Sequence, residues 1–252
     1  MPRLTQPATA LGEEHALLAS PRRAAILTAG VVGLTAVVFA LVADHGALAR
    51  IQQLDDAWLR LMIAGRAPAL TAVAKVFNVL GLVYVTLPVR IGVAGFLALR
   101  RRWWHLAAFT AAVVTSEVLI GSLKGIYDRA RPPGSLVTTS GASFPSGHAV
   151  AASVTVMAAV IALVPAGRRR AIWGAAAVAF SILMGISRAY LGAHWLSDAT
   201  AGILLGTSCA LLAALMAGLL QQRQHRRRQP AGTQRQAGVP PPEHAERGRG
   251  PA

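Results

Sequence analysis

Long apolar runs, separated by short polar segments, make up most of the chain between residues 24 and 220. A helix that crosses the hydrocarbon core of a bilayer needs about 20 mainly apolar residues. The runs reach or approach this length, so they predict an all-α, polytopic membrane protein with six transmembrane helices. We expect these helices at 24–43, 80–99, 103–123, 148–164, 171–186 and 199–220.

The first run also has features of a secretory signal peptide. Arg22 and Arg23 precede it, and Ala47-Leu48-Ala49 would supply a cleavage site of small residues. With 20 residues, however, the run is longer than the apolar segment of a signal peptide and matches a membrane span. We therefore expect an uncleaved first helix.

Residues 44–69 follow a different, amphipathic pattern. Asp55 and Asp56 begin a stretch in which large apolar side chains are interspersed with arginines; the apolar ones are Trp58, Leu59, Leu61, Met62 and Ile63. This mixture is typical of a helix that lies in the plane of the membrane surface. We expect an additional interfacial helix between the first and second transmembrane helices.

The two ends of the chain differ in composition from its middle. We expect residues 24–220 to form one membrane domain, with a flexible N-terminus at 1–23 and a disordered basic tail at 221–252. The tail is rich in Pro, Gly, Gln and Arg and has too few apolar residues to build a core. Its arginines are interpreted as a determinant of membrane topology.

Positive charges along the chain predict how it is oriented in the membrane. Six spans place both termini on one side, and 16 of the 25 Lys and Arg residues fall on that side, against eight on the other. The side richer in positive charge is normally cytoplasmic. We therefore expect a multi-pass protein of the cell membrane with both termini in the cytoplasm.

Composition agrees with a membrane protein and disfavours a nucleic-acid partner. Hydrophobic residues make up 54% of the chain and charged residues only 14%. The net charge of +15 comes from residues between the apolar runs and in the tail, with no interleaved aromatic residues for base stacking. Cys209 is the single cysteine and lies in an apolar run, so it excludes an internal disulfide and says little about the compartment.

Two features inside the predicted spans concern helix packing. Arg90 interrupts the second span, where a charge is costly unless it is paired or reaches the interface. Glu117 in the third span is the expected partner, and snorkelling of Arg90 to the interface is the alternative. Gly202 and Gly206, four residues apart in the sixth span, predict close packing against another helix.

Three polar stretches at the edges of the runs contain residues suited to phosphate chemistry. Lys124, Arg131 and Arg188 supply positive charge, and arginine presents a planar fork of donors that fits phosphate oxygens. Ser146 precedes the fourth apolar run, where a serine is typical of a helix N-cap, and Gly147 would let the backbone approach a ligand closely. A helix N-terminus favours a bound anion.

The histidines of these stretches suggest acid and nucleophilic catalysis. His148 lies at the start of the fourth span, where it can protonate a leaving group. His194 and Asp198 are four residues apart and would share one helix face, so the carboxylate can orient the imidazole as a nucleophile. A zinc site built from the two histidines and the carboxylate is the competing interpretation. Three nearby cations disfavour it, and we expect no metal and no cofactor.

Taken together, the stretches resemble the three-part signature of the type 2 phosphatidic acid phosphatase family of membrane lipid phosphatases. The matching parts are Lys124 with Arg131-Pro132, then Pro145-Ser146-Gly147-His148, then Ser187-Arg188 with His194 and Asp198. All signature residues and their spacings agree, over residues 124–198. The soluble vanadium-dependent haloperoxidases have a similar site, but six apolar runs argue against that branch.

The resemblance implies a metal-independent phosphatase in which the residue matching His194 attacks phosphorus, that matching Asp198 supports it and that matching His148 protonates the leaving group. It implies phosphate binding by Lys124, Arg131, Ser146, Gly147 and Arg188. We expect hydrolysis of a lipid phosphomonoester or pyrophosphate at the outer face: phosphatidic acid, phosphatidylglycerol phosphate or polyprenyl pyrophosphate. The alternatives are a lipid phosphotransferase that uses the same phosphohistidine, and a non-catalytic lipid-phosphate transporter.

Overall fold

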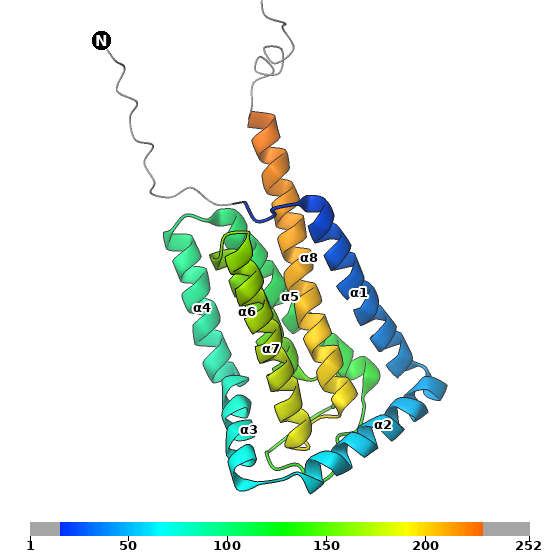
Figure 1. The fold of residues 1–252 in the computed structure, drawn as a ribbon. Helices are drawn as coiled ribbons and strands as arrows, with labels where there is room; N and C mark the ends of the chain where they lie inside the picture. Colours follow the sequence, from blue (N-terminus) through cyan, green and yellow to red (C-terminus); the bar gives the residue numbers. More distant parts are fainter. Residues whose placement is uncertain (1–15, 229–252) are drawn as a thin grey trace, which may run out of the picture.

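Between residues 16 and 228, the part of the chain that the computed structural model describes, the apolar runs and the segments beside them form eight α-helices and no strand. Figure 1 shows these helices as a bundle. They are α1 (Pro21–Ala43), α2 (His45–Ala64), α3 (Pro68–Leu80), α4 (Val83–Leu99), α5 (Trp103–Tyr127), α6 (Gly147–Leu163), α7 (Arg168–Tyr190) and α8 (Leu196–Arg228). The predicted all-α class is confirmed.

Helix α8 packs against α1, α5, α6 and α7 and so organises the bundle (Figure 1). The contact between α8 and α6 is close because Gly202 and Gly206 lack side chains. A Cβ at Gly202 would lie 2.7 Å from the carbonyl oxygen of Ser146, and one at Gly206 would lie 2.7 Å from that of Val150. The predicted close packing at this glycine pair is confirmed. It holds the start of α6 against the start of α8.

Four helices are long and apolar enough to cross a membrane: α1, α5, α7 and α8. Helices α3 and α4 would add a fifth span if this pair, bent by 50°, is counted as one. Helix α6 is apolar but has only 17 residues. The protein is multi-pass, and each of the six predicted apolar runs lies mainly within a helix. The sequence predicts six spans, but within the described range the candidate spans number four or five.

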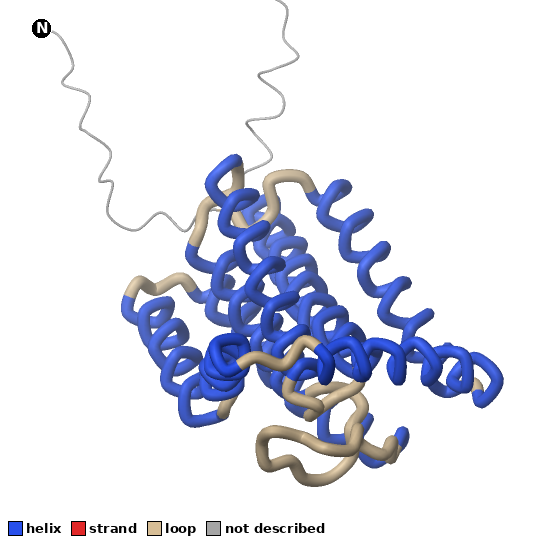
Figure 2. Tube along the Cα trace, turned by 60° about the horizontal axis from the view of Figure 1, so that its bottom comes forward, coloured by secondary structure: helices blue, strands red, loops and turns tan. Residues whose placement is uncertain are grey.

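The region between α1 and α4 differs from the prediction. The segment expected to be one interfacial helix at 44–69 contains α2, which ends at Ala64, and the start of a separate helix, α3. A break at Gly81 and Leu82 divides α3 from α4, because the chain bends sharply there. Helix α2 runs across one end of the bundle (Figures 1 and 2). Its position at a membrane surface stays a prediction.

The predicted domain ends also differ from the structure. Helix α1 begins at Pro21, with Ser20 as its N-cap, and Leu17 is buried and donates its N–H to Gln221 at 3.2 Å. Helix α8 continues to Arg228, so the first residues of the predicted tail are helical. The remainder of that tail and residues 1–15 of the predicted flexible N-terminus lie outside the described residues.

The two polar ends of the bundle are distinct. The beginning of α1 and the end of α8 lie at one end (Figure 1). The loops that join α5 to α6 and α7 to α8 lie at the other end, which Figure 2 brings forward, beside α2. The predicted site residues lie at this second end.

The predicted pair of Arg90 and Glu117 is confirmed. Nη1 of Arg90 lies 2.6 Å from Oε1 of Glu117, and the arginine is buried while 52% of the glutamate side chain is exposed. Arg90 also donates to Oγ1 of Thr155 at 2.9 Å and to the carbonyl oxygen of Ala151 at 3.5 Å. The guanidinium thus faces α6 rather than snorkelling away, and it joins α4, α5 and α6.

Candidate active site

Two loops that are far apart in the sequence meet at the end of the bundle next to α2. The amide N–H of Leu136 donates to the carbonyl oxygen of Leu191 at 2.8 Å, and that of Ser146 donates to the carbonyl oxygen of Asp198 at 3.0 Å. The eight predicted site residues all lie on these loops or on the helix turns that flank them: Lys124, Arg131, Ser146, Gly147, His148, Arg188, His194 and Asp198.

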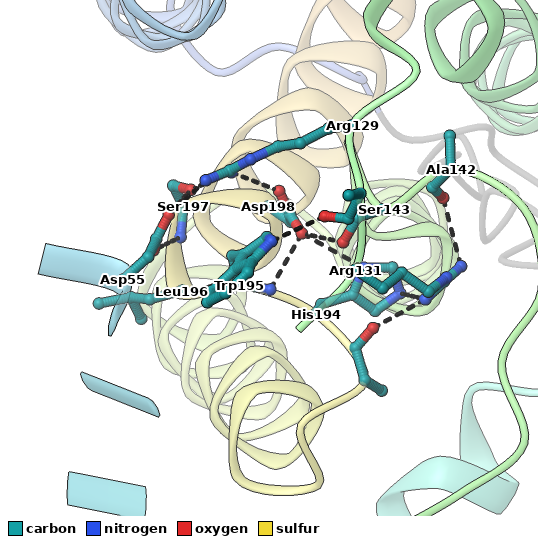
Figure 3. A network of polar contacts seen from close by, with 12 residues as sticks. Asp55, Arg129, Arg131, Ala142, Ser143, His194, Trp195, Leu196, Ser197 and Asp198 are labelled. Atoms are coloured by element: carbon teal, nitrogen blue, oxygen red, sulfur yellow. Dashed lines mark hydrogen bonds and ion pairs between the residues drawn. The ribbon is translucent and has the colours of Figure 1, made fainter. Parts of the chain in front are cut away.

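His194 and Asp198 face each other, but they do not share a helix face as predicted, because α8 begins at Leu196 and His194 lies in the loop before it. Both are buried, and Nδ1 of His194 lies 3.7 Å from Oδ2 of Asp198 (Figure 3). This separation is longer than a hydrogen bond, so the contact is an electrostatic one. Oδ2 accepts hydrogen bonds from the backbone N–H of Trp195 at 2.9 Å and from Oγ of Ser143. The carboxylate is therefore held in place by groups other than the histidine.

Arg131 lies on the opposite side of the His194 ring from this carboxylate. Its Nη1 is 3.2 Å from Nε2 of His194 and donates to the carbonyl oxygen of Ala193 at 2.7 Å. Carbonyl oxygens of the loop before α6 fix the rest of the guanidinium; they belong to Ser140, Gly141 and Ala142. Burial lowers the pKa of Arg131 and the nearby Asp198 opposes that shift, and an arginine stays charged under these conditions.

The environment of His194 keeps its imidazole neutral. Burial lowers the pKa of His194 to about 4; the proximity of Asp198 opposes this effect, and the charges of Arg188 and Arg131 reinforce it. A neutral imidazole has a lone pair on one ring nitrogen, which a nucleophile needs. The ring is thus in the protonation state for attack at neutral pH.

Two further predicted cations flank the same region. Nζ of Lys124, in the last turn of α5, donates to the carbonyl oxygen of Ala142 at 2.5 Å, and Arg131 donates to the same oxygen. Arg188, in the last turn of α7, is buried, and its Nη1 donates to Oδ1 of Asn78 on α3. The structure therefore brings together positive groups from α5, α7 and the loop before α6.

His148 packs against the break between α3 and α4. A Cβ placed on Gly81 would lie 2.5 Å from Cδ2 of His148, so only a glycine leaves room for the ring in this position. Nε2 of His148 is buried and has no hydrogen-bond partner within the described residues. The unpredicted break at Gly81 therefore forms one wall of the candidate site.

Ser146 occupies the predicted N-cap position of α6, but its side chain does not cap the helix. Its Oγ is buried without a partner in the described part of the chain, so the expected cap hydrogen bond is wrong. Gly147, the first residue of α6, has open space where a Cβ would point. The start of α6 therefore has a buried hydroxyl that is not satisfied within the described residues, next to a position with room for a further group.

Buried polar atoms without partners gather at this site. Among the described residues they include Oγ of Ser146, Nε2 of His148, Nε of Arg188 and Nδ1 of His194. Such atoms are rare in folded proteins, and each one calls for an explanation. A bound anion would give hydrogen-bond partners to the donors among them. Within residues 16–228, no group of three or more His, Cys, Asp or Glu side chains is arranged to hold a metal ion.

Sequence reasoning did not single out several residues that the structure places at the site. Arg129 bonds Asp198, and Asp55 of α2 bonds Arg129 (Figure 3). Ser143 donates a hydrogen bond to the same carboxylate. Asn78 accepts a hydrogen bond from Arg188, and Gly81 packs against the ring of His148. A second arginine two positions before Arg131 is the single local signal that could have directed attention to Arg129.

A helical bundle with a buried histidine–carboxylate pair and several arginines at one end is an arrangement suited to a membrane phosphatase. The family model of the PAP2 superfamily matches residues 102–221 of the chain. The matched range includes the signature stretches at 124–198, so the predicted resemblance to the phosphatidic acid phosphatase family is confirmed.

Known proteins of the family resemble the chain along most of their own length. Phosphatidylglycerophosphatase B of Bacillus subtilis (strain 168) is 29% identical over 162 residues, which cover 62% of this chain and 79% of that protein. The crystal structure of a transmembrane PAP2-type phosphatidylglycerolphosphate phosphatase from Bacillus subtilis matches with a TM-score of 0.65 and 24% identity, covering 78% of this chain and 96% of that one. The crystal structure of Aquifex aeolicus LpxE matches with a TM-score of 0.51 and 26% identity, covering 62% and 91%.

Proposed function

We propose that this membrane phosphatase hydrolyses a lipid phosphomonoester or pyrophosphate through a covalent phosphohistidine on His194, without a metal ion. The observation that carries the proposal is the contact between Arg131 and His194. Arginine has no acceptor, so Nη1 of Arg131 must donate to Nε2 of His194 across 3.2 Å. Nε2 is then the nitrogen with the lone pair, and it lies beside the cation that would hold the phosphate.

The proposed reaction has two steps. In the first, Nε2 of His194 attacks phosphorus and the bond between phosphorus and the lipid oxygen breaks. That oxygen takes a proton from His148, whose protonated form the negative charge of the bound phosphate would favour. In the second, water attacks the phosphohistidine and gives a proton to His148, and orthophosphate leaves while the lone pair returns to Nε2. Asp198 stabilises the positive imidazolium ring between the steps, as a carboxylate does in other histidine-based catalysts.

The cations and the start of α6 would hold the phosphate. A phosphate oxygen would replace Nε2 of His194 as the acceptor of Arg131 and would take up the unpartnered Nε of Arg188. The hydroxyl of Ser146 and the open N-terminus of α6 at Gly147 supply neutral donors. Lys124 adds a charge at the rim. These groups neutralise the equatorial oxygens, which is the main requirement of phosphoryl transfer.

The relatives favour one of the candidate substrates. Two of them are described as phosphatases of phosphatidylglycerol phosphate. We therefore place phosphatidylglycerol phosphate first, ahead of phosphatidic acid and polyprenyl pyrophosphate. The positive-inside pattern supports a cytoplasmic location for both termini. Since the site lies at the end of the bundle away from the start of α1 and the end of α8, the substrate would enter from the outer leaflet (Figure 1).

Side-by-side assays with purified full-length protein in detergent test this proposal. We expect orthophosphate release from at least one of the three lipid phosphates, with activity retained in EDTA and lost by orders of magnitude in His194→Ala. Quenching in alkali during turnover of a ³²P-labelled substrate should trap label on the wild-type protein. Activity that disappears with the chelator would contradict the metal-free mechanism. Preferential transfer of the label to an added alcohol would make the protein a phosphotransferase.

A further inference from the structure

The buried carboxylate Asp198 belongs to a chain of charges that reaches outside the signature residues. Nη1 of Arg129 lies 2.8 Å from Oδ1 of Asp198, and Nη2 lies 2.8 Å from Oδ2 of Asp55 (Figure 3). All three side chains are at least nine-tenths buried: 2% of Asp55, 8% of Arg129 and none of Asp198 is exposed. Arg129 thus links two buried carboxylates that come from α2 and α8.

Several hydrogen bonds close this chain of charges into a network. Asp55 accepts from the backbone N–H of Ser197 at 2.9 Å and from its Oγ at 2.5 Å, and the same Oγ accepts from Nη1 of Arg129 at 2.7 Å. Gln52 of α2 accepts from Nη2 of Arg129 at 2.6 Å. The network therefore surrounds the first turn of α8, where Asp198 stands, with fixed partners.

The backbone of Arg129 extends this network to the other oxygen of Asp198. Its carbonyl oxygen accepts the N–H of Ser143 at 2.7 Å, and Oγ of Ser143 donates to Oδ2 of Asp198. The guanidinium also lies over the ring of Trp195, 5.6 Å from the ring centroid. One residue thus acts on both carboxylate oxygens, on one through its side chain and on the other through Ser143.

Helix α2 contributes to this network through one buried residue, Asp55. Within α2, which is described in full, Asp55 is the one buried residue, and apolar side chains such as Leu54 and Leu61 are exposed. A buried carboxylate is costly without a partner, so Asp55 is held where Arg129 and Ser197 compensate it. Its contacts connect α2 to the first turn of α8.

We infer that Arg129 and Asp55 are positioning residues for the proposed reaction: together they orient the Asp198 carboxylate toward Nδ1 of His194. This inference rests on the proposed function. Neither residue is needed to bind phosphate, because the donors of Arg129 are already directed at Asp198, Ser197, Gln52 and Asp55. Their loss should therefore slow the chemical step and leave substrate affinity nearly unchanged. A displacement of about 1 Å in such a group lowers a rate about 10²-fold.

Steady-state kinetics of the full-length protein in detergent, with a lipid phosphate that the parent hydrolyses, test the inference. We expect Arg129→Gln and Asp55→Asn each to lower kcat by about 10²-fold while KM changes only a few-fold. Arg129→Lys should recover part of kcat, since it keeps the charge. The double variant Arg129→Gln/Asp55→Asn should lose no more than Arg129→Gln alone, because the two residues act as a unit.

Asp56→Asn is the matched control. It makes the same substitution at the next position of α2, and the asparagine can still accept the hydrogen bond that Gln52 donates to Asp56. We expect its kcat to remain near that of the parent. Size-exclusion profiles and apparent melting temperatures report whether each variant is folded.

Three results would overturn the inference. The first is a folded Arg129→Gln or Asp55→Asn variant with nearly parental kcat, and the second is a large rise in KM at constant kcat, which would make Arg129 a phosphate ligand. The third is loss of folded protein in Arg129→Gln, Arg129→Lys and Asp55→Asn alike, which would give the network a purely structural role. A parent that hydrolyses none of the lipid phosphates would instead contradict the proposed function itself.

Discussion

Nη1 of Arg131 lies 3.2 Å from Nε2 of His194, on the opposite side of the imidazole ring from Asp198. This contact selects one tautomer of the neutral ring. Because arginine only donates, Nε2 must accept, and the ring proton is on Nδ1, which faces Oδ2 of Asp198 at 3.7 Å. In the proposed reaction, the guanidinium that would bind the phosphate would therefore also prepare the nucleophile before the substrate arrives.

The first prediction concerns this double role of Arg131. Arg131→Lys keeps a positive charge but cannot reproduce a planar fork that is bonded to four carbonyl oxygens and to His194. We expect kcat to fall by about 10²–10³-fold, the usual effect of removing one donor that stabilises the transition state. Rapid-quench experiments should show slower formation of the phosphohistidine.

Arg60→Lys is a suitable control for this substitution. Arg60 is exposed on α2, and the same exchange of side chains there should leave kcat unchanged. Parental burst kinetics in Arg131→Lys would show that the fork is dispensable and would remove the basis for the assigned tautomer.

The second prediction concerns the stability of the protein at acidic pH. Burial lowers the pKa of His194 to about 4, whereas a histidine in an unfolded chain has a pKa of about 6.5. Between these values the unfolded state binds more protons than the folded state, so stability rises with pH across this window and is lost as the pH falls through it. We expect the apparent melting temperature to decrease as the pH is lowered from about 6.5 to about 4.

Comparison with His194→Gln isolates the contribution of this one group. Glutamine does not titrate in the window, so the variant should show a smaller decrease in melting temperature over the same pH range. Titration of the imidazole signals by NMR in labelled protein provides a direct measurement. A His194 signal that titrates near pH 6.5 would show that burial does not control this group.

The third prediction concerns Gly81 at the break between α3 and α4. Its backbone conformation suits any residue, but a Cβ there would lie 2.5 Å from Cδ2 of His148, so Gly81→Ala must displace the ring. If His148 is the general acid, kcat should fall by about 10²-fold with a lipid phosphate, whose alkoxide leaving group needs a proton. An aryl phosphate with an acidic leaving group should lose much less.

Gly92→Ala provides the control for Gly81→Ala. A Cβ at Gly92 of α4 meets no atom within 4 Å, so this variant should keep its activity on both substrates. Equal losses on the lipid phosphate and on the aryl phosphate in Gly81→Ala would indicate damage to phosphate binding rather than to proton transfer.

How far the site can be predicted from sequence depends on whether its signals are local. His194 and Asp198 are four residues apart, and this short separation along the chain is the local signal that pairs them, although His194 lies before the start of α8. Ser146 shows the limit of such rules, because it occupies the predicted N-cap position while its hydroxyl remains unpartnered in the site. A helix pattern identifies the position of a residue but not the partner that its side chain selects.

The residues that sequence reasoning does not find are joined only by tertiary structure. Asp55 and Arg129 are 74 residues apart, and no periodic pattern relates the two positions. Gly81 contacts His148 only because the chain bends between α3 and α4. The hydrophobic pattern does not indicate this bend, because apolar residues continue through the break. The helices themselves are predictable, since burial in a membrane requires long apolar segments whatever their bends.

The fourth prediction concerns the pair of Arg90 and Glu117 within the bundle. Removing one partner of a fully buried ion pair costs about 3–5 kcal/mol, but 52% of the Glu117 side chain is exposed. Arg90 also keeps its bonds to Thr155 and Ala151 when the glutamate is lost. We therefore expect Glu117→Gln to destabilise the protein by only about 1–2 kcal/mol, measured as a decrease in the apparent melting temperature in detergent.

Exchanging the two charges should not restore this stability. In Arg90→Glu/Glu117→Arg the carboxylate at position 90 can accept from the hydroxyl of Thr155, but it cannot donate to the carbonyl oxygen of Ala151, which Arg90 contacts at 3.5 Å. The double variant should therefore melt below Glu117→Gln, although it retains an ion pair. Wild-type stability in the exchanged variant would show that the pair alone holds α4 to α5 and that the contacts of Arg90 with α6 add nothing.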